Sequence, residues 1–123
     1  MNLKNAVALI TGGSAGIGRS IAEILAASGA RVAITGRDRA RLEEAAQSLG
    51  VLGIQADVTD EADVLRTYRE VLAKFGDLDI LVNNAGIGTF NDLADMDTAG
   101  FERVFATNVT GVMMMGREAA RFS

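Results

Sequence analysis

Four short apolar segments recur along this chain of 123 residues, and helical patterns fill the gaps between them. They cover residues 6–10, 31–35, 51–56 and 79–83, and their side chains are apolar almost without alternation. A strand needs apolar side chains on both of its faces when helices cover both faces of the sheet, as they do in parallel α/β sheets. The segments therefore predict four buried strands of one parallel sheet.

Amphipathic segments between these strands predict helices over residues 17–28, 38–49 and 60–75. Each is followed by a glycine, which adopts the left-handed conformation past a helix end more easily than other residues do. Spacings of three and four residues predict which side chains face the sheet. These are Ile17, Ile21, Ile24 and Leu25 in the first helix, Leu42, Ala45, Ala46 and Leu49 in the second, and Val64, Tyr68, Val71, Leu72 and Phe75 in the third.

A longer helix is predicted over residues 98–121, after a connection over 86–97. It carries two apolar stripes, of which one can cover the sheet while the other would face water in a monomer. The fourth strand has an apolar edge at residues 80–82, and such an edge favours pairing with another chain. We therefore expect a homo-oligomer formed through the fourth strand, the last helix, or both.

The composition excludes several kinds of site. The chain holds no His and no Cys, so it can form no Ser-His-Asp triad, Cys nucleophile or Cys/His zinc site. Its formal net charge of -4 gives no basic field for nucleic acid or an anionic membrane. No segment approaches the roughly 18 to 20 apolar residues of a membrane span, and we expect a cytoplasmic protein. Asp92, Asp95 and Asp97 are expected to cap and solvate a loop, so no metal site is predicted.

A glycine-rich turn links the first predicted strand to the first predicted helix. From residue 11 to residue 18 it reads Thr-Gly-Gly-Ser-Ala-Gly-Ile-Gly. Such a turn needs residues without a Cβ where the backbone takes unusual dihedrals, where a phosphate approaches the main chain, and where helix and strand pack closely. The free N–H groups at the helix start can then bind a pyrophosphate. Its place in a βαβ unit predicts a dinucleotide-binding turn.

Two further motifs end later strands: Asp57-Val58 after the third, and Asn83-Asn84-Ala85-Gly86 at the fourth. With the glycine-rich turn, they resemble the short-chain dehydrogenase/reductase family. The resemblance implies an α/β fold with a Rossmann-like doubly wound parallel sheet in the strand order 3-2-1-4. It implies that residues 1–123 are one NAD(P)-binding domain that spans the first half of a family member and lacks the C-terminal catalytic half.

The resemblance also assigns roles to individual residues. The cofactor pyrophosphate would lie on the glycine-rich turn, the adenine would border the motif after the third strand, and the ribose side would follow the fourth strand. Asn108 matches the catalytic-tetrad asparagine, although a purely structural asparagine in the last helix is the alternative. The residues expected to bind the cofactor in these places are Gly12, Ser14, Gly16, Ile17, Gly18, Asp57, Val58, Asn84, Ala85 and Gly86.

The end of the second strand bears on the charge of the cofactor. An acidic residue about 20 positions after the glycine-rich turn accepts a hydrogen bond from the ribose 2′-hydroxyl of NAD, whereas a nearby Arg accommodates the 2′-phosphate of NADP. Gly36 stands at the expected acidic position and Arg37 follows it, so NADP is predicted in preference to NAD. The alternative is that Arg37 and Arg39 are solvated charges at a helix start that Asp38 caps.

The family's acid catalyst has no counterpart after Asn108. The family uses a Ser and a Tyr-x-x-x-Lys segment, but the single tyrosine, Tyr68, is followed by Leu72 and belongs to a core stripe, and Lys4 and Lys74 match nothing in the family's site. We therefore expect the cofactor-binding portion of an oxidoreductase that transfers hydride between NADPH and a carbonyl or alcohol, catalytically incomplete as written. The alternative is a non-catalytic nucleotide-binding or scaffold protein.

Overall fold

Strands and helices alternate along residues 3–84, the part of the chain that the computed structural model describes. The predicted connection over residues 86–97 and the predicted helix over 98–121 lie outside the described residues. Along the described part, each element lies within a few residues of its predicted place. In order the elements are β1 (Val7–Thr11), α1 (Gly16–Ala27), β2 (Arg31–Gly36), α2 (Arg39–Leu49), β3 (Leu52–Gln55), α3 (Glu61–Phe75) and β4 (Ile80–Asn83).

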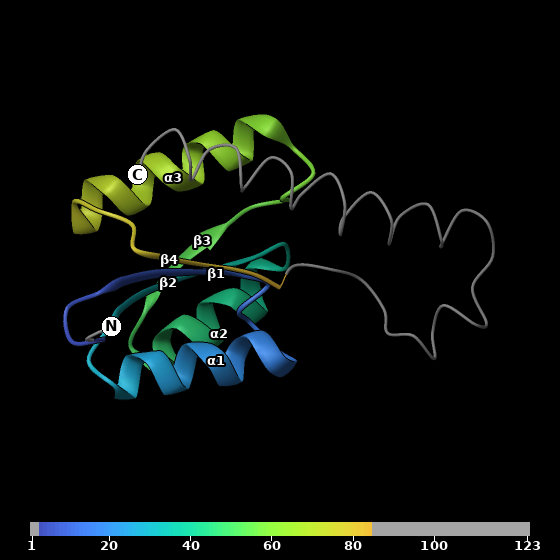
Figure 1. Cartoon of the computed structure of the whole chain (residues 1–123). Coiled ribbons are helices and arrows are strands. Elements are labelled where there is room, and N and C mark those ends of the chain that lie inside the picture. The colour runs from blue at the N-terminus through green and yellow to red at the C-terminus, as the bar shows by residue number, and fades with distance from the viewer. Residues whose placement is uncertain (1–2, 85–123) are drawn as a thin grey trace.

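The strands form one parallel sheet in the order β3-β2-β1-β4, as predicted (Figure 1). β1 lies in the middle, with Leu9 opposite Ala33 of β2 on one side and Leu81 of β4 on the other. The chain reverses its direction of travel across the sheet after β3, so that β4 pairs with β1. This arrangement places the carboxyl ends of β1 and β4 side by side, where doubly wound sheets bind their ligands.

Two apolar cores cover the two faces of the sheet. α3 lies on one face, and α1 and α2 lie on the other (Figure 1). Alternate residues of β1 point to opposite faces, so Val7 and Leu9 belong to the core under α3 while Ala8 and Ile10 belong to the core under α1 and α2. Tyr68 is fully buried in the first of these cores, which confirms its interpretation as a core residue.

The face that α1 presents to the sheet agrees only in part with its apolar pattern, since Ile21 and Leu25 pack against the core as predicted. Ile17 and Ile24, both expected inside, are 74% and 64% exposed. Gly18 and Ala22 are buried instead, with Ile21 and Leu25 only partly covered. The reason is close packing: the start of α1 approaches the neighbouring backbone, and only small side chains fit on the face that makes this approach.

β3 also departs from the expectation that both of its faces are covered. Of its four residues only Ile54 is buried, whereas Gly53 and Gln55 are exposed. β3 is one of the two outer strands of the described sheet, so one of its sides has no neighbouring strand. Gln55 is thereby left at the surface at the end of the strand.

The helix ends follow the predicted signals. Asp38 caps α2 by accepting a hydrogen bond from the Arg41 N–H at 3.2 Å, and Asp60 caps α3 by accepting from the Ala62 N–H at 2.9 Å. Left-handed glycines end both helices, at Gly50 and Gly76. Neither these helices nor α1 is long and apolar enough to cross a membrane.

Truncating matched aliphatic side chains tests the observed packing. We expect Leu9→Ala, at a fully buried position, to lower the free energy of unfolding by about 2–5 kcal/mol, because a cavity replaces the lost side chain. The exposed Ile24→Ala should change it by less than about 0.5 kcal/mol. Urea unfolding followed by circular dichroism measures both, and equal losses would contradict the orientation of α1.

Candidate functional site

The glycine-rich turn lies at the carboxyl end of β1 and is hydrogen-bonded to β2. The Gly13 N–H donates to the carbonyl oxygen of Thr35 at 3.0 Å, and the Gly12 N–H lies 3.3 Å from the Thr35 hydroxyl oxygen. A Cβ on Gly13 would stand 2.5 Å from Ile34 Cγ2, so the turn approaches β2 more closely than a larger residue allows. Thr35 is buried, and no motif in the sequence marks it, because its bonding partner lies 23 residues away along the chain.

Hydrogen bonds also join the same turn to the end of β4. The Thr11 hydroxyl accepts a hydrogen bond from the Asn84 N–H at 3.0 Å, and Thr11 Oγ1 lies 3.3 Å from the Val82 carbonyl oxygen. The Asn84 side-chain amide donates to the Gly12 carbonyl at 3.3 Å. The structure thus brings the glycine-rich turn and Asn84 together, as the sequence analysis expects, and Thr11 is the buried group that joins the two strand ends.

Three glycines of the turn meet two different structural needs. Gly12 and Gly16 have positive φ angles of 68° and 59°, which residues with a Cβ rarely adopt. Gly18 is required by proximity, because a Cβ there would overlap the Asn84 amide nitrogen and the Gly12 carbonyl oxygen. The space around Gly16 is open by contrast: apart from its chain neighbours and the backbone of its own helix, no atom lies within 4 Å of the place of a Cβ.

The amino end of α1 is electrostatically unlike those of α2 and α3. Its cap residue, Ala15, offers no side-chain acceptor, and its first turn carries no acidic residue. α2 and α3 have the carboxylates of Asp38 and Asp60 at this place. The N–H groups of the first turn of α1 therefore remain available to an anion, with the positive end of the helix dipole behind them.

A cavity of about 300 Å³ opens beside this turn at the ends of β1, β2 and β3. Six of the residues predicted to bind a cofactor line it, while Gly16, Ile17 and Gly18 lie at the start of α1. A larger hollow of about 740 Å³ lies along the outer side of β3, between α2 and α3, and shares no residue with the turn. The six lining residues are Gly12, Ser14, Arg37, Asp57, Val58 and Asn84.

Three predicted site residues lie beyond the described part of the chain. They are Ala85, Gly86 and Asn108, and their assignments stay predictions. Within residues 3–84, no cluster of three acidic side chains is arranged to hold a metal ion.

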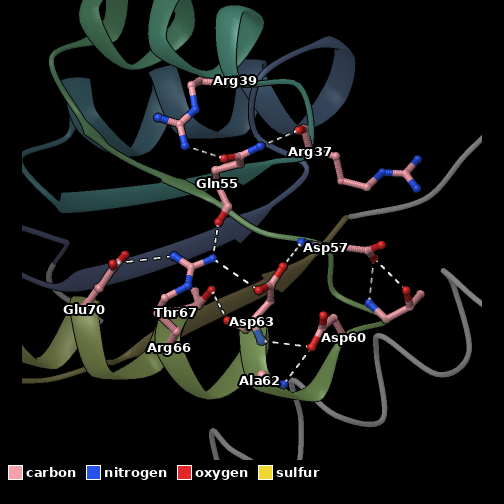
Figure 2. A network of polar contacts seen from close by, with 11 residues as sticks. Arg37, Arg39, Gln55, Asp57, Asp60, Ala62, Asp63, Arg66, Thr67 and Glu70 are labelled. Atoms are coloured by element: carbon pink, nitrogen blue, oxygen red, sulfur yellow. Dashed lines mark hydrogen bonds and ion pairs between the residues drawn. The ribbon is translucent and has the colours of Figure 1, made fainter.

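The two arginines after β2 differ in their contacts. Arg39 donates to the side-chain oxygen of Gln55 at 2.8 Å, whereas the Arg37 guanidinium forms no hydrogen bond or ion pair with the described residues. Figure 2 shows the two side chains extending in opposite directions. Asp38 between them caps α2, so the predicted capping is confirmed. Arg37 is exposed and lines the cavity.

Asp57 is held by the turn that follows β3. Its carboxylate accepts hydrogen bonds from the Thr59 N–H at 2.9 Å and the Thr59 hydroxyl at 2.7 Å, and its own N–H donates to Asp63 at 2.9 Å. Partial burial raises the pKa of Asp57, but the two bonds from Thr59 and the charge of Arg37 outweigh it and hold the pKa below its ordinary value. Asp57 therefore stays ionised at neutral pH.

Comparison with known proteins identifies the family. The profile of the short chain dehydrogenase family matches residues 6–122. The chain belongs to the short chain dehydrogenase family. Its fold is the NAD(P)-binding Rossmann fold of these oxidoreductases, which bind a nicotinamide dinucleotide.

The names of individual relatives of this chain refer to different compounds. A cis-2,3-dihydrobiphenyl-2,3-diol dehydrogenase from Pseudomonas sp. (strain KKS102) is 44% identical over 121 residues, which are 93% of this chain and 44% of the relative. A sorbitol dehydrogenase from Cereibacter sphaeroides is 38% identical over 123 residues, with 98% of this chain and 48% of the relative covered. The chain thus spans about half the length of these relatives.

A solved structure matches the fold closely. The 3-ketoacyl-(acyl-carrier-protein) reductase from Brucella melitensis, crystallised with NADH, superposes with a TM-score of 0.87 at 41% sequence identity. The match covers 98% of this chain and 51% of the reductase chain.

The environment of Asp57 predicts how its carboxyl titrates. Because its folded-state pKa lies below the unfolded-state value of about 3.9, the carboxylate stabilises the fold above about pH 4, and this contribution is lost as the pH falls through the folded-state pKa. Thr59→Val removes the hydroxyl donor and should raise the pKa of Asp57, and Arg37→Ala should raise it less. Carbon-13 NMR titration of the carboxyl measures this. An unchanged midpoint in Thr59→Val would contradict the assigned cause.

Proposed function

We propose that this short chain dehydrogenase binds NADP(H) in preference to NAD(H), with the 2′-phosphate at Arg37. Two observations support this: the Arg37 guanidinium forms no hydrogen bond or ion pair with residues 3–84, and Gly36, the last residue of β2, carries no acidic side chain. The nearest carboxylate along the chain, Asp38, caps α2 and lies 3.8 Å from the Arg41 guanidinium. A guanidinium suits a phosphate by charge and geometry.

The remaining cofactor contacts are proposed from the same geometry. The pyrophosphate is expected at Gly12, Ser14 and the uncapped start of α1, formed by Gly16, Ile17 and Gly18, because N–H groups without an acceptor gather there. Asp57 and Val58 form the opposite wall, where the adenine is expected. Asn84, with Ala85 and Gly86, would lie along the ribose. The exposure of Ile17 agrees with a contact to a bound cofactor.

We also propose that residues 1–123 act as one cofactor-binding domain without the family's complete catalytic set. Bound NADPH would supply a hydride to a carbonyl, but the proton that must follow needs an acid, and these 123 residues contain no Tyr-x-x-x-Lys segment. Asn108 is the one catalytic residue proposed for this chain. The location of the protein in the cytoplasm and its assembly into a homo-oligomer stay predictions from the sequence.

Replacing Arg37 tests the cofactor assignment. We expect Arg37→Ala to weaken NADPH binding by about 10- to 100-fold, because a charge-assisted hydrogen bond to phosphate is lost. NADH binding should barely change, since NADH has no 2′-phosphate. Fluorescence titration of each nucleotide measures the two affinities. Arg69→Ala, at an exposed arginine of α3, is the matched control and should leave both unchanged. Equal affinities of the unsubstituted chain for NADPH and NADH would refute the assignment.

Binding and activity assays together separate a catalytically incomplete cofactor-binding domain from a complete enzyme and from a scaffold protein. We expect the 123-residue chain to bind NADPH without oxidising it in the presence of a carbonyl compound. Absorbance at the reduced nicotinamide band follows the reaction. Turnover would mean that another residue or a partner supplies the acid. Failure to bind either nucleotide would favour a scaffold role.

A further inference from the structure

Gln55 joins β3 to the segment that carries Arg37. It is the last residue of β3 and lies opposite Gly36, the last residue of β2. The Ala56 N–H continues this pairing by donating to the Gly36 carbonyl at 3.1 Å. The side chain of Gln55 is therefore anchored directly beside the connection from β2 to α2, where the two arginines lie.

Both the nitrogen and the oxygen of the Gln55 side-chain amide form hydrogen bonds to the segment between β2 and α2. Its nitrogen donates to the backbone carbonyl of Arg37 at 3.2 Å, and its oxygen accepts from the Arg39 guanidinium at 2.8 Å (Figure 2). The first bond holds the backbone of Arg37 next to the cavity. The second holds the Arg39 guanidinium toward the outer side of β3, where it lines the larger hollow and not the cavity.

The backbone of Gln55 is itself held by α3. Arg66 donates to the Gln55 carbonyl oxygen, and its guanidinium also lies 3.4 Å from Asp63 and 3.5 Å from Glu70. Asp63 in turn accepts the Asp57 N–H (Figure 2). α3 thus supports two walls of the cavity, Asp57 directly and Arg37 through Gln55.

We propose that Gln55 is a positioning residue for cofactor choice: its bond to the Arg37 carbonyl fixes Arg37 at the cavity for the 2′-phosphate. This inference rests on the proposed function, since it assumes that Arg37 meets the 2′-phosphate. Gln55 does not line the cavity beside the turn, but it lines an adjoining hollow of about 340 Å³ together with Arg37 and Asp57. Its effect should appear in the affinity for NADPH and not in the affinity for NADH.

Gln55→Met tests this proposal, because methionine has a similar length but neither an amide donor nor an amide acceptor. We expect it to weaken NADPH binding to the whole 123-residue chain by about threefold to tenfold, the range for one or two exposed hydrogen bonds, with NADH binding changed by less than about twofold. Fluorescence titration gives both affinities. Gln47→Met, at an exposed glutamine of α2, is the matched control and should change neither. Circular dichroism shows whether each variant is folded.

A second comparison separates positioning from a general structural effect. If Gln55 acts through Arg37, then Gln55→Met should cause no further loss of NADPH affinity in the Arg37→Ala background. Arg39→Met, which leaves the bond from Gln55 to the Arg37 carbonyl in place, should keep the preference for NADPH. An equal weakening of NADPH and NADH by Gln55→Met, or an undiminished loss in the Arg37→Ala background, would overturn the proposal.

The results also distinguish this proposal from the one on which it rests. If Arg37→Ala reduces NADPH affinity but Gln55→Met does not, the role of Gln55 is refuted and the assignment of the 2′-phosphate stands. If Arg37→Ala leaves the preference between the nucleotides unchanged, both proposals fall.

Discussion

The close approach of the turn after β1 to the ends of β2 and β4 is the constraint on which the rest of the site depends. Hydrogen bonds of Thr11 and Asn84 join β1 to β4, and on the side of β2 Thr35 accepts hydrogen bonds from the N–H groups of the turn. This approach leaves no room for a Cβ at Gly13 or Gly18. It brings the start of α1 against the sheet through small residues, and the N–H groups of the first turn of α1 have no side-chain cap. The exposure of larger side chains on α1 is one outcome of this packing.

Much of the fold follows from local sequence. The apolar segments locate the strands within a residue or two, and aspartates and glycines locate the ends of α2 and α3 because capping depends on neighbouring backbone groups. The strand order required the resemblance of three motifs to a known family. The inward face of α1 was predicted wrongly in part. Helical periodicity assigns large apolar residues such as Ile17 and Ile24 to the inward face, whereas the close packing at Gly18 leaves room only for small residues there.

The candidate site was predictable only as far as its motifs extend. Gly12, Arg37, Asp57 and Asn84 meet around one cavity as expected. Thr35 and Gln55 were missed because their side chains bond to backbone groups 23 and 18 residues away in the sequence, and no local pattern reports such contacts. The chain carries a net negative charge, yet the described residues offer an anion two local features: a helix end without a carboxylate cap, and the Arg37 guanidinium at the cavity, which forms no hydrogen bond or ion pair with them.

The contact between Arg66 and the Gln55 carbonyl also affects how the sheet can grow. This carbonyl lies on the outer side of β3, where an added strand would need it as an acceptor, and the guanidinium occupies it. Charged side chains at such edges protect folded proteins against unwanted association. The described sheet is therefore shielded at its β3 end, and a further strand would meet less resistance beside β4, where the side chains at positions 80–82 are apolar and only partly covered.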